Sequence, residues 1–228
     1  MAEQHKAKIK EIFASIQGEG PYVGVKQLFI RFCDCNLNCR YCDTEFSSDS
    51  NYVEYTPSEL FDKVKTFNLD TITSVSLTGG EPLLSADFLA DFLPLMGGRK
   101  IYLETNATLY NELDKIKKYV DIISADIKLE SSTGIKNAYV LHDKFFEHAA
   151  GKECFAKIVF DESITDEEVD NCCVLAKKYD LDLILQPKMN GYTLTVSPEF
   201  CTKILDKFLD KHVKVRLIPQ VHKFINVI

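Results

Sequence analysis

The sequence lacks a long apolar run, and its amino-terminal segment is not hydrophobic. Residues 1–10 are polar and charged, unlike a secretory leader, and no run approaches the roughly 20 apolar residues that span a bilayer. Positive charge is not in excess either, because the formal net charge is -7. We therefore expect a cytoplasmic protein that contacts no membrane and does not bind nucleic acid through a basic surface. A small molecule or another protein is the expected partner.

Low-complexity segments, internal repeats and linkers are also absent, so we expect one domain over residues 1–228. A hydrophobic content of 46% is sufficient for one sizeable core at this length. Eight cysteines do not indicate a secreted disulfide framework here, because four of them crowd between Cys33 and Cys42. Such crowding indicates a metal site.

Short apolar runs alternate with helical segments along the chain. Because strands separated by helices form right-handed crossovers, this order predicts an α/β fold with a parallel sheet, either closed as a barrel or open. The predicted strands are residues 26–32, 74–77, 100–103, 121–127, 155–160, 181–185 and 213–218. Ligand-binding residues of such sheets lie beyond the carboxyl ends of the strands. The loops 33–50 and 78–84 each follow a strand and are expected there.

Helix starts are marked by N-capping residues. Thr56 and Glu59 form one capping box around Pro57, and the run from Thr165 to Glu168 forms a second. Ser197 followed by proline is a third start signal.

The loop after the first predicted strand carries Cys35, Cys39 and Cys42 in a C-x-x-x-C-x-x-C spacing. This spacing lets one loop place three thiolates on three corners of a 4Fe-4S cluster and leaves the fourth iron open to S-adenosylmethionine (SAM). The alternative is a structural zinc site that also uses Cys33, although its C-x-C-x-x-x-C-x-x-C spacing departs from the usual paired spacing. Cys33 is otherwise a core or loop thiol, or a spare ligand.

At these residues the sequence resembles the radical SAM superfamily, and within it the 7-carboxy-7-deazaguanine synthase (QueE) family. The three-cysteine motif and the segments 78–82 (TGGEP) and 104–106 (ETN) resemble the superfamily. Narrower similarity to the family lies in residues 15–20 (SIQGEG), 42–44 (CDT) and 219–223 (PQVHK). One departure is Asp34, where the family usually has glycine before the first cluster cysteine; a left-handed backbone there is harder for aspartate.

The resemblance implies an incomplete (βα) barrel of the radical SAM type, a homodimer, a 4Fe-4S cluster, SAM, Mg²⁺ and a flavodoxin-type or similar electron donor. It implies a lyase that converts 6-carboxy-5,6,7,8-tetrahydropterin to 7-carboxy-7-deazaguanine, a step toward queuosine, by hydrogen abstraction and ring contraction. One alternative is a glycyl-radical-enzyme activase that uses the same cluster and SAM. The other is a zinc-stabilised binding module without catalysis.

The resemblance also implies roles for particular residues. Cluster ligands are Cys35, Cys39 and Cys42, and Thr44 would bind Mg²⁺. Contacts to the cofactor are expected from Tyr41, Cys42, Asp43, Gly79, Gly80, Glu81, Glu104, Asp126, Lys128 and Gln186. Contacts to the substrate are expected from Ile16, Gln17, Gly18, Arg31, Thr78 and His222, with Gln220 and Lys223 beside them.

Structural alternatives stay open for several of these residues. Gly79 and Gly80 can form a plain turn, and Thr44 can cap the backbone. Asp126, Lys128 and Gln186 can be solvated, and His222 can be structural. Arg31 can pair with a nearby acid such as Glu19. The other histidines, His5, His142, His148 and His212, lie in polar sequence surroundings and carry no signal.

Overall fold

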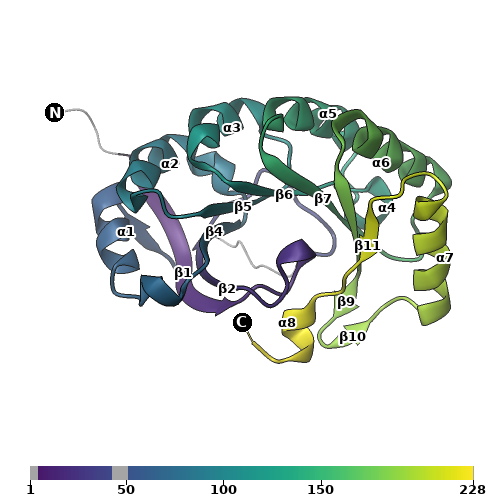
Figure 1. Cartoon of the computed structure of the whole chain (residues 1–228), viewed down its shortest axis with the longest axis horizontal. Helices are drawn as coiled ribbons and strands as arrows, with labels where there is room; N and C mark the ends of the chain where they lie inside the picture. Colours follow the sequence, from purple (N-terminus) through teal and green to yellow (C-terminus); the bar gives the residue numbers. More distant parts are fainter. Residues whose placement is uncertain (1–4, 43–50, 228) are drawn as a thin grey trace.

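Seven parallel strands and two antiparallel ones form a single nine-stranded sheet that is strongly curved (Figure 1). The computed structural model describes residues 5–42 and 51–227. The spatial order is β11-β8-β7-β6-β5-β4-β2-β1-β3, with β1 antiparallel to both β2 and β3. The strands are β1 (Ala7–Ile16), β2 (Lys26–Phe32), β3 (Val53–Tyr55), β4 (Ser74–Gly79), β5 (Ile101–Thr105), β6 (Ile122–Asp126), β7 (Glu153–Phe160), β8 (Asp182–Pro187) and β11 (Val215–Leu217). A separate hairpin pairs β9 (Met189–Asn190) with β10 (Thr193–Leu194).

All seven predicted strands are present, and they are the seven parallel strands of the sheet. The sheet does not close, because β11 and β3 are its two edges, and this confirms the incomplete barrel. β1 and β3 were not predicted. Along β1, Ala7 and Ile9 are buried while Lys8 between them is exposed, which is the alternation of a strand with one covered face.

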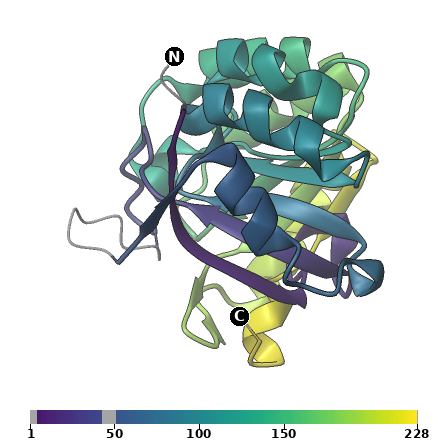
Figure 2. The same ribbon diagram turned by 90° about the vertical axis from the view of Figure 1, so that its left-hand side faces the viewer.

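Most helices lie along the convex side of the sheet, as Figures 1 and 2 show, whereas α8 lies apart from this layer. They are α1 (Pro57–Val64), α2 (Ala86–Phe92), α3 (Tyr110–Ile116), α4 (Glu130–Thr133), α5 (Ala138–Ala149), α6 (Asp166–Tyr179), α7 (Pro198–Leu209) and α8 (Val221–Phe224). Short 3₁₀ helices lie in the connections, among them η1 (Gly20–Tyr22) between β1 and β2 and η3 (Pro82–Ser85) before α2. In the described part of the chain, no helix has the length and apolar character needed to cross a membrane.

The three helix starts expected from the sequence are confirmed. Thr56 accepts a hydrogen bond from the Glu59 backbone, and the Glu59 carboxylate accepts one from the Thr56 backbone at 2.8 Å. Thr165 and Glu168 form the same reciprocal pair at the start of α6, and Ser197 caps α7. Such caps satisfy backbone donors that would otherwise lack a partner, at about 1 kcal/mol each.

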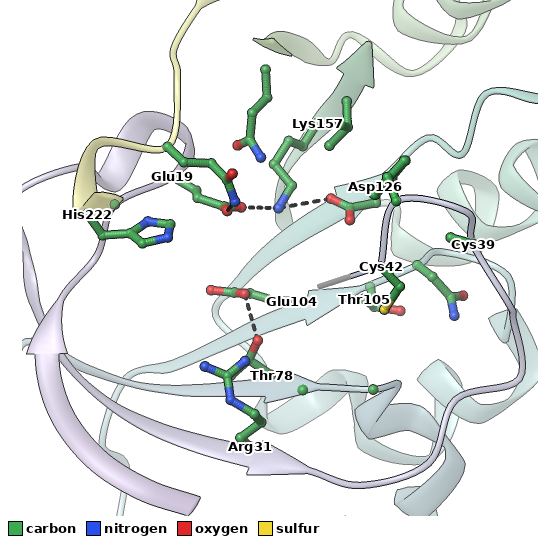
Figure 3. Close-up of a pocket in the computed structure, with 18 of the residues that line it drawn as sticks. Glu19, Arg31, Cys39, Cys42, Thr78, Glu104, Thr105, Asp126, Lys157 and His222 are labelled. Carbon is green, nitrogen blue, oxygen red and sulfur yellow. Dashed lines mark hydrogen bonds and ion pairs between the residues drawn. The ribbon is translucent and has the colours of Figure 1, made fainter. Parts of the chain in front are cut away.

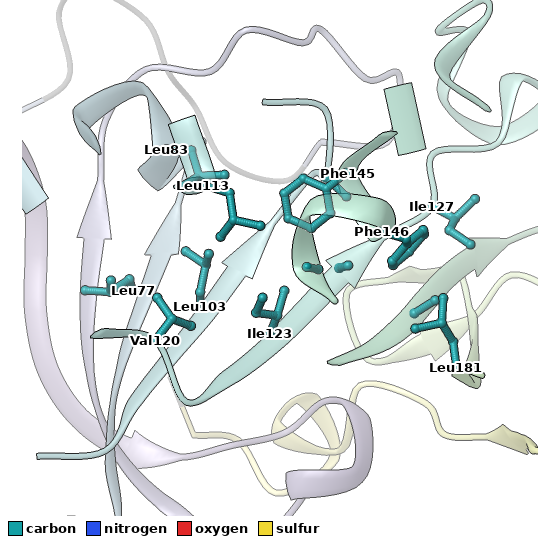
Figure 4. Packing of buried hydrophobic residues seen from close by; sticks show 14 of the residues in the cluster. Leu77, Leu83, Leu103, Leu113, Val120, Ile123, Ile127, Phe145, Phe146 and Leu181 are labelled. Atoms are coloured by element: carbon teal, nitrogen blue, oxygen red, sulfur yellow. The ribbon is translucent and has the colours of Figure 1, made fainter. Parts of the chain in front are cut away.

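Side chains alternate between the two faces of each strand, and this alternation separates core from site. Leu77, Leu103 and Ile123 point outward and pack under α3 and α5 against Leu113 and Phe145 (Figure 4). The inward positions of the same strands carry Thr78, Glu104 and Asp126. Near the amino ends of the strands the inner face is apolar instead, where Tyr102, Ile122, Phe155 and Ile184 form a second buried cluster. The polar positions therefore concentrate at the carboxyl end of the sheet.

Candidate active site

A cavity of about 460 Å³ opens at the carboxyl end of the parallel strands. Its walls come from the inner face of the sheet, the loop after β2, the loop after β1 and the start of α8. The size suits a small organic ligand with a few directed polar contacts. Figure 3 shows the acidic and basic side chains pointing into it.

The loop after β2 presents all three motif cysteines, Cys35, Cys39 and Cys42, to this cavity. Asp34 enters the loop with a φ of +65°, so this position has the left-handed backbone that glycine adopts most readily. The Cys35 sulfur accepts hydrogen bonds from the Leu37 backbone at 3.5 Å and from Asn106 Nδ2 at 3.8 Å. Such donors stabilise a thiolate, which is the form that binds iron.

Cys33 lies apart from the three motif cysteines. It is 8% exposed, it does not line the cavity, and its backbone N–H donates to the Lys8 carbonyl on β1. This is the environment of a core thiol. Cys172 and Cys173 lie on the buried side of α6 and are part of the core, as their helical spacing suggested.

Gly79 and Gly80 bring their backbone against the start of the cysteine loop. Gly79 has a φ of +123°, and a Cβ there would lie 2.3 Å from the Phe32 carbonyl oxygen, so only glycine fits. The Gly80 N–H donates to that carbonyl at 3.1 Å, and the Glu81 N–H donates to the Asp34 carbonyl at 2.9 Å. The glycine segment is thus fixed to the cysteine loop and also lines the cavity.

The Glu81 side chain does not line the cavity. It is fully buried, and its carboxylate accepts hydrogen bonds from the backbones of Leu83 and Asn106 and from the Thr105 hydroxyl, at 2.7 to 3.1 Å. Burial raises its pKa to about 7, against the opposing effect of these hydrogen bonds. Because Asn106 in turn contacts Cys35, Glu81 supports the cysteine loop on the side away from the cavity. The predicted contact between the Glu81 side chain and the cofactor stays a prediction.

Glu104 occupies the middle of the inner face. One of its oxygens accepts from Gln17 Nε2 at 2.9 Å and from the Ser76 hydroxyl at 3.2 Å, and the other accepts from the Thr78 hydroxyl at 2.8 Å. The second N–H of the Gln17 amide donates to Gln27 at 2.9 Å, so both of its donor hydrogens are used within the protein. The carboxylate keeps one acceptor position, on Oε2, for a ligand.

Arg31 lies beside Thr78 on the neighbouring strand and faces the same cavity. Its Nε donates to Glu11 Oε1 at 2.5 Å, and its guanidinium lies 5.7 Å from the centroid of the Phe13 ring. Arg31 therefore does pair with an acid, as the structural alternative from the sequence suggested, but that acid is Glu11 on β1 and not Glu19. Glu19 pairs with a lysine that the sequence did not single out.

That lysine is Lys157, at an inward position of β7. Its ammonium lies between Glu19 and Asp126, with an ion pair to each, and the distance to Asp126 is 3.2 Å (Figure 3). Burial alone would raise the pKa of Glu19, but the adjacent ammonium and the hydrogen bond from Gln220 outweigh it and lower the pKa to about 2. A single cation within the apolar run 155–160 was the only sequence signal for this residue.

Asp126 and Lys128 lie together at the end of β6. Lys128 Nζ donates to Asp126 Oδ2 at 2.7 Å and to the Tyr41 hydroxyl at 3.3 Å. Gln186, at the end of β8, is 3% exposed, and its carboxamide oxygen has no hydrogen-bond partner among the residues that the structure describes. A buried acceptor without a partner is costly, so this oxygen at the cavity wall fits a ligand that brings a donor.

His142 on α5, which carries no signal in the sequence, is a buried structural residue in the fold. Its ring is completely buried, the Lys128 backbone N–H donates to Nε2 at 3.0 Å, and Nδ1 donates to the Ala107 carbonyl at 3.0 Å. Burial lowers its pKa from 6.5 to about 4, because the neutral ring alone suits this environment. His142 therefore holds the backbone that carries Lys128.

The variant His142→Gln is expected to flatten the pH dependence of stability, because glutamine keeps both hydrogen bonds without titrating. Between pH 7 and pH 5 the unfolded chain takes up a proton at His142 while the folded chain does not, so folding stability falls as the pH falls. The expected loss in the wild type is about 2 kcal/mol larger than in the variant. Anaerobic urea unfolding of both proteins at pH 5, 6 and 7 measures it, and parallel curves would contradict it.

The carboxy-terminal segment closes the cavity from the side of the loop after β1. The Val221 N–H donates to the Gly18 carbonyl at 2.8 Å, and Gln220 Nε2 donates to Glu19 at 2.7 Å. A Cβ on Gly18 would lie 2.2 Å from Nδ1 and 2.5 Å from Cβ of His222, so glycine is required for this contact. The two ends of the sequence thus build one wall.

The variant Gly18→Ala is expected to displace α8 and to raise the KM for the substrate by at least about tenfold, since a misplaced contact residue loses about 1.4 kcal/mol or more of binding. Iron content is expected to be unchanged, because the cysteine loop lies elsewhere in the cavity. Steady-state kinetics of variant and wild type measure the effect. An unchanged KM would show that α8 tolerates the added methyl group.

Of the residues assigned from the sequence, all that the structure describes line this one cavity except Glu81. The assigned positions Asp43 and Thr44 lie outside the described residues. Within residues 5–42 and 51–227, no three His, Cys, Asp or Glu side chains are placed to hold a single metal ion.

An open parallel barrel with three cysteines in the loop after its first parallel strand defines a class of enzyme, and comparison with known proteins agrees. The model of the radical SAM superfamily matches residues 29–144. The chain is therefore a member of the radical SAM superfamily and uses a 4Fe-4S cluster and SAM.

Relatives of known name narrow the assignment. The chain is 34% identical to the 7-carboxy-7-deazaguanine synthase of Geobacter sulfurreducens, over 96% of both chains. It is also 34% identical to that of Archaeoglobus fulgidus, over 97% of this chain and 99% of the relative. The chain belongs to the 7-carboxy-7-deazaguanine synthase family. The crystal structure of QueE from Escherichia coli has the same fold, with a TM-score of 0.64, 18% identity and 95% of each chain covered.

Proposed function

We propose that this chain converts 6-carboxy-5,6,7,8-tetrahydropterin to 7-carboxy-7-deazaguanine, as the names of its relatives suggest. The observation that carries the proposal is that one cavity joins the three cluster cysteines to a second set of polar groups around Glu104. A cofactor and a small polar substrate can therefore meet in it. The glycyl-radical-enzyme activase and the zinc-stabilised module are not favoured by these relatives.

Glu104 is the group best placed to bind the pterin ring. Three donors orient its carboxylate, and Oε2 can accept one further hydrogen bond from a ring N–H or amino group. Gln17 has no donor hydrogen left for the ligand, so its side chain orients Glu104, while the backbone of residues 16–18 faces the cavity. We thus assign Glu104 to the substrate, although the sequence suggested the cofactor.

Arg31 would bind the substrate carboxylate. Its Nε donates a hydrogen bond to Glu11. The N–H donors of the two terminal nitrogens can then serve a ligand in the cavity, which Arg31 and Thr78 both line. A guanidinium holds a carboxylate through paired N–H donors, which fixes its orientation as well as its position. Figure 3 shows Arg31 and Thr78 on the same side of the cavity as Glu104.

The residues present fit the cofactors. The three thiols lie in one loop with hydrogen-bond donors to Cys35, and Gln186 presents to the same cavity an acceptor that no described residue pairs with. When bound, the cluster and SAM supply one-electron hydrogen-abstraction chemistry. The protein orients the ligands and excludes water from the site. Water is excluded from below because an apolar cluster closes the barrel there, formed by Tyr102, Ile122, Phe155 and Ile184.

Four further parts of the proposal rest on the family resemblance. Mg²⁺ would bind through Thr44, which lies outside the described residues, and would fix the substrate carboxylate. The enzyme would act as a homodimer in the cytoplasm and would accept electrons from a flavodoxin-type or similar donor.

An anaerobic assay with 6-carboxytetrahydropterin, SAM, dithionite and Mg²⁺ tests the proposal. The expected result is a product with the mass of 7-carboxy-7-deazaguanine, formed only when all components are present. SAM cleavage without any conversion of the pterin, by protein that holds a full cluster, would show that the substrate is a different one.

A further inference from the structure

Lys157 has no assigned role, and its position is unusual for a lysine. The residue is 7% exposed, it points inward from the middle of β7, and its strand neighbours Ala156 and Ile158 are part of the core. An ammonium taken out of water at such a place is costly unless paired charges and hydrogen bonds compensate it. A leucine or valine would fill this position at no such cost, so the lysine calls for a function.

On one side the ammonium contacts the cofactor half of the cavity. Asp126 lies opposite Lys157 in the β6–β7 register and accepts from it through Oδ1 at 3.2 Å. The other oxygen of Asp126 accepts from Lys128 at 2.7 Å, and Lys128 contacts the hydroxyl of Tyr41. Tyr41 lies in the cysteine loop between Cys39 and Cys42.

On the other side the ammonium contacts the substrate half. It donates to Glu19 Oε2, while Glu19 Oε1 accepts from Gln220 of the carboxy-terminal segment at 2.7 Å. The Glu19 backbone N–H donates to Gln17 Oε1 at 3.0 Å, and Gln17 donates to Glu104 at 2.9 Å. The contacts therefore run without a break from the cysteine loop to the carboxylate assigned to the pterin.

We propose that Lys157 is a positioning residue that sets the distance between the cofactor and the substrate, an inference that rests on the function proposed above. Glu19 and Asp126 belong to different halves of the cavity and would repel each other without the ammonium between them. Hydrogen abstraction requires the two reactants in near-contact, and a displacement of about 1 Å costs on the order of 10²-fold in rate. Without Lys157 the two halves would bind their ligands out of alignment.

The variant Lys157→Met keeps the length and the apolar stem of the side chain and removes its charge. The expected result is a product rate lowered about 100-fold with a smaller loss, under about tenfold, of 5'-deoxyadenosine release. The ratio of pterin product to released 5'-deoxyadenosine therefore falls at least tenfold. Lys157→Arg, which keeps the cation, is expected to recover part of that ratio.

Lys178→Met is the matched control. Lys178 on α6 also pairs with a carboxylate, Asp143 of α5, at 2.7 Å, but on the outer helical layer. Its loss is expected to leave the product ratio unchanged. Iron content and the midpoint temperature of unfolding are measured for every variant, so that the ratio of product to 5'-deoxyadenosine is compared among folded proteins with the same cluster content.

The outcomes separate the inference from the proposed function. If wild-type protein with a full cluster makes no deazaguanine, the proposed function fails. If the wild type is active and Lys157→Met keeps the wild-type ratio, even at a lower rate, the lysine is only structural and the inference is overturned. If Lys157→Met does not hold a cluster, the variant Glu19→Gln is used in its place, because it removes the carboxylate charge that pairs with Lys157. A wild-type ratio of pterin product to 5'-deoxyadenosine in Glu19→Gln would then overturn the inference as well.

Discussion

Replacing Cys39 by alanine is expected to abolish the 4Fe-4S cluster and to lower product formation by at least 10⁴-fold. Cys39 lies between Cys35 and Cys42 in a loop whose three sulfurs face one cavity. Two thiolates hold a cubane cluster poorly, and a cluster without its full ligand set cannot present one open iron to SAM. Iron and sulfide per chain and the rate of SAM cleavage measure the effect in protein purified without air.

Cys33→Ala is the control for that experiment. Cys33 is buried beside β1 and does not line the cavity, so this variant is expected to keep its iron and its SAM cleavage. Equal loss of iron from Cys33→Ala and Cys39→Ala would contradict the three-cysteine assignment. It would favour a site of four thiolates with no open position.

Glu104→Gln is expected to lower kcat/KM for the pterin by about 10²- to 10³-fold. The carboxamide has nearly the same shape, but its NH₂ group would face donors, either Gln17 and Ser76 or Thr78 and the bound heterocycle. A hydrogen bond to a charged group contributes about 1.5 to 3 kcal/mol, and a buried donor left without an acceptor adds to the loss. Steady-state kinetics with the cluster content of each preparation measure the effect.

Glu153→Gln gives the matched comparison for Glu104. Glu153 begins β7 at the opposite end of the sheet, where its carboxylate accepts from the Tyr22 hydroxyl outside the cavity. It is expected to retain wild-type kinetics. A Glu104→Gln variant with normal kcat/KM for the pterin but a weakened affinity for SAM would instead return Glu104 to the cofactor.

The parallel sheet could be predicted from the sequence because its seven strands are short, mainly apolar segments, several of them unbroken, that alternate with helical segments. β1 could not, since Lys8, Lys10 and Glu11 interrupt its apolar residues and one of its faces is in contact with solvent. An antiparallel strand of this kind, with one face toward solvent, alternates too weakly to be separated from a polar terminus. The consequence is that Glu11, the partner of Arg31, was also missed.

Site residues that lie in or beside a motif could be predicted from the sequence. Site residues that act through contacts with residues far away in the sequence could not. Cys35, Gly79 and Arg31 stand in or beside recognisable segments. Lys157 becomes significant only because Glu19, 138 positions away, folds against it. His142 likewise depends on Lys128 and Ala107, which belong to two other loops. Partners brought together by the fold leave no local pattern in the sequence.

The measurement that tests the account most directly is the EPR spectrum of the reduced, anaerobically purified protein before and after addition of SAM, with iron, sulfide and zinc determined on the same sample. The account predicts about four irons per chain in a reduced cluster whose spectrum shifts when SAM binds the iron that no cysteine holds. One zinc per chain without iron, or a cluster whose spectrum SAM leaves unchanged, would contradict it.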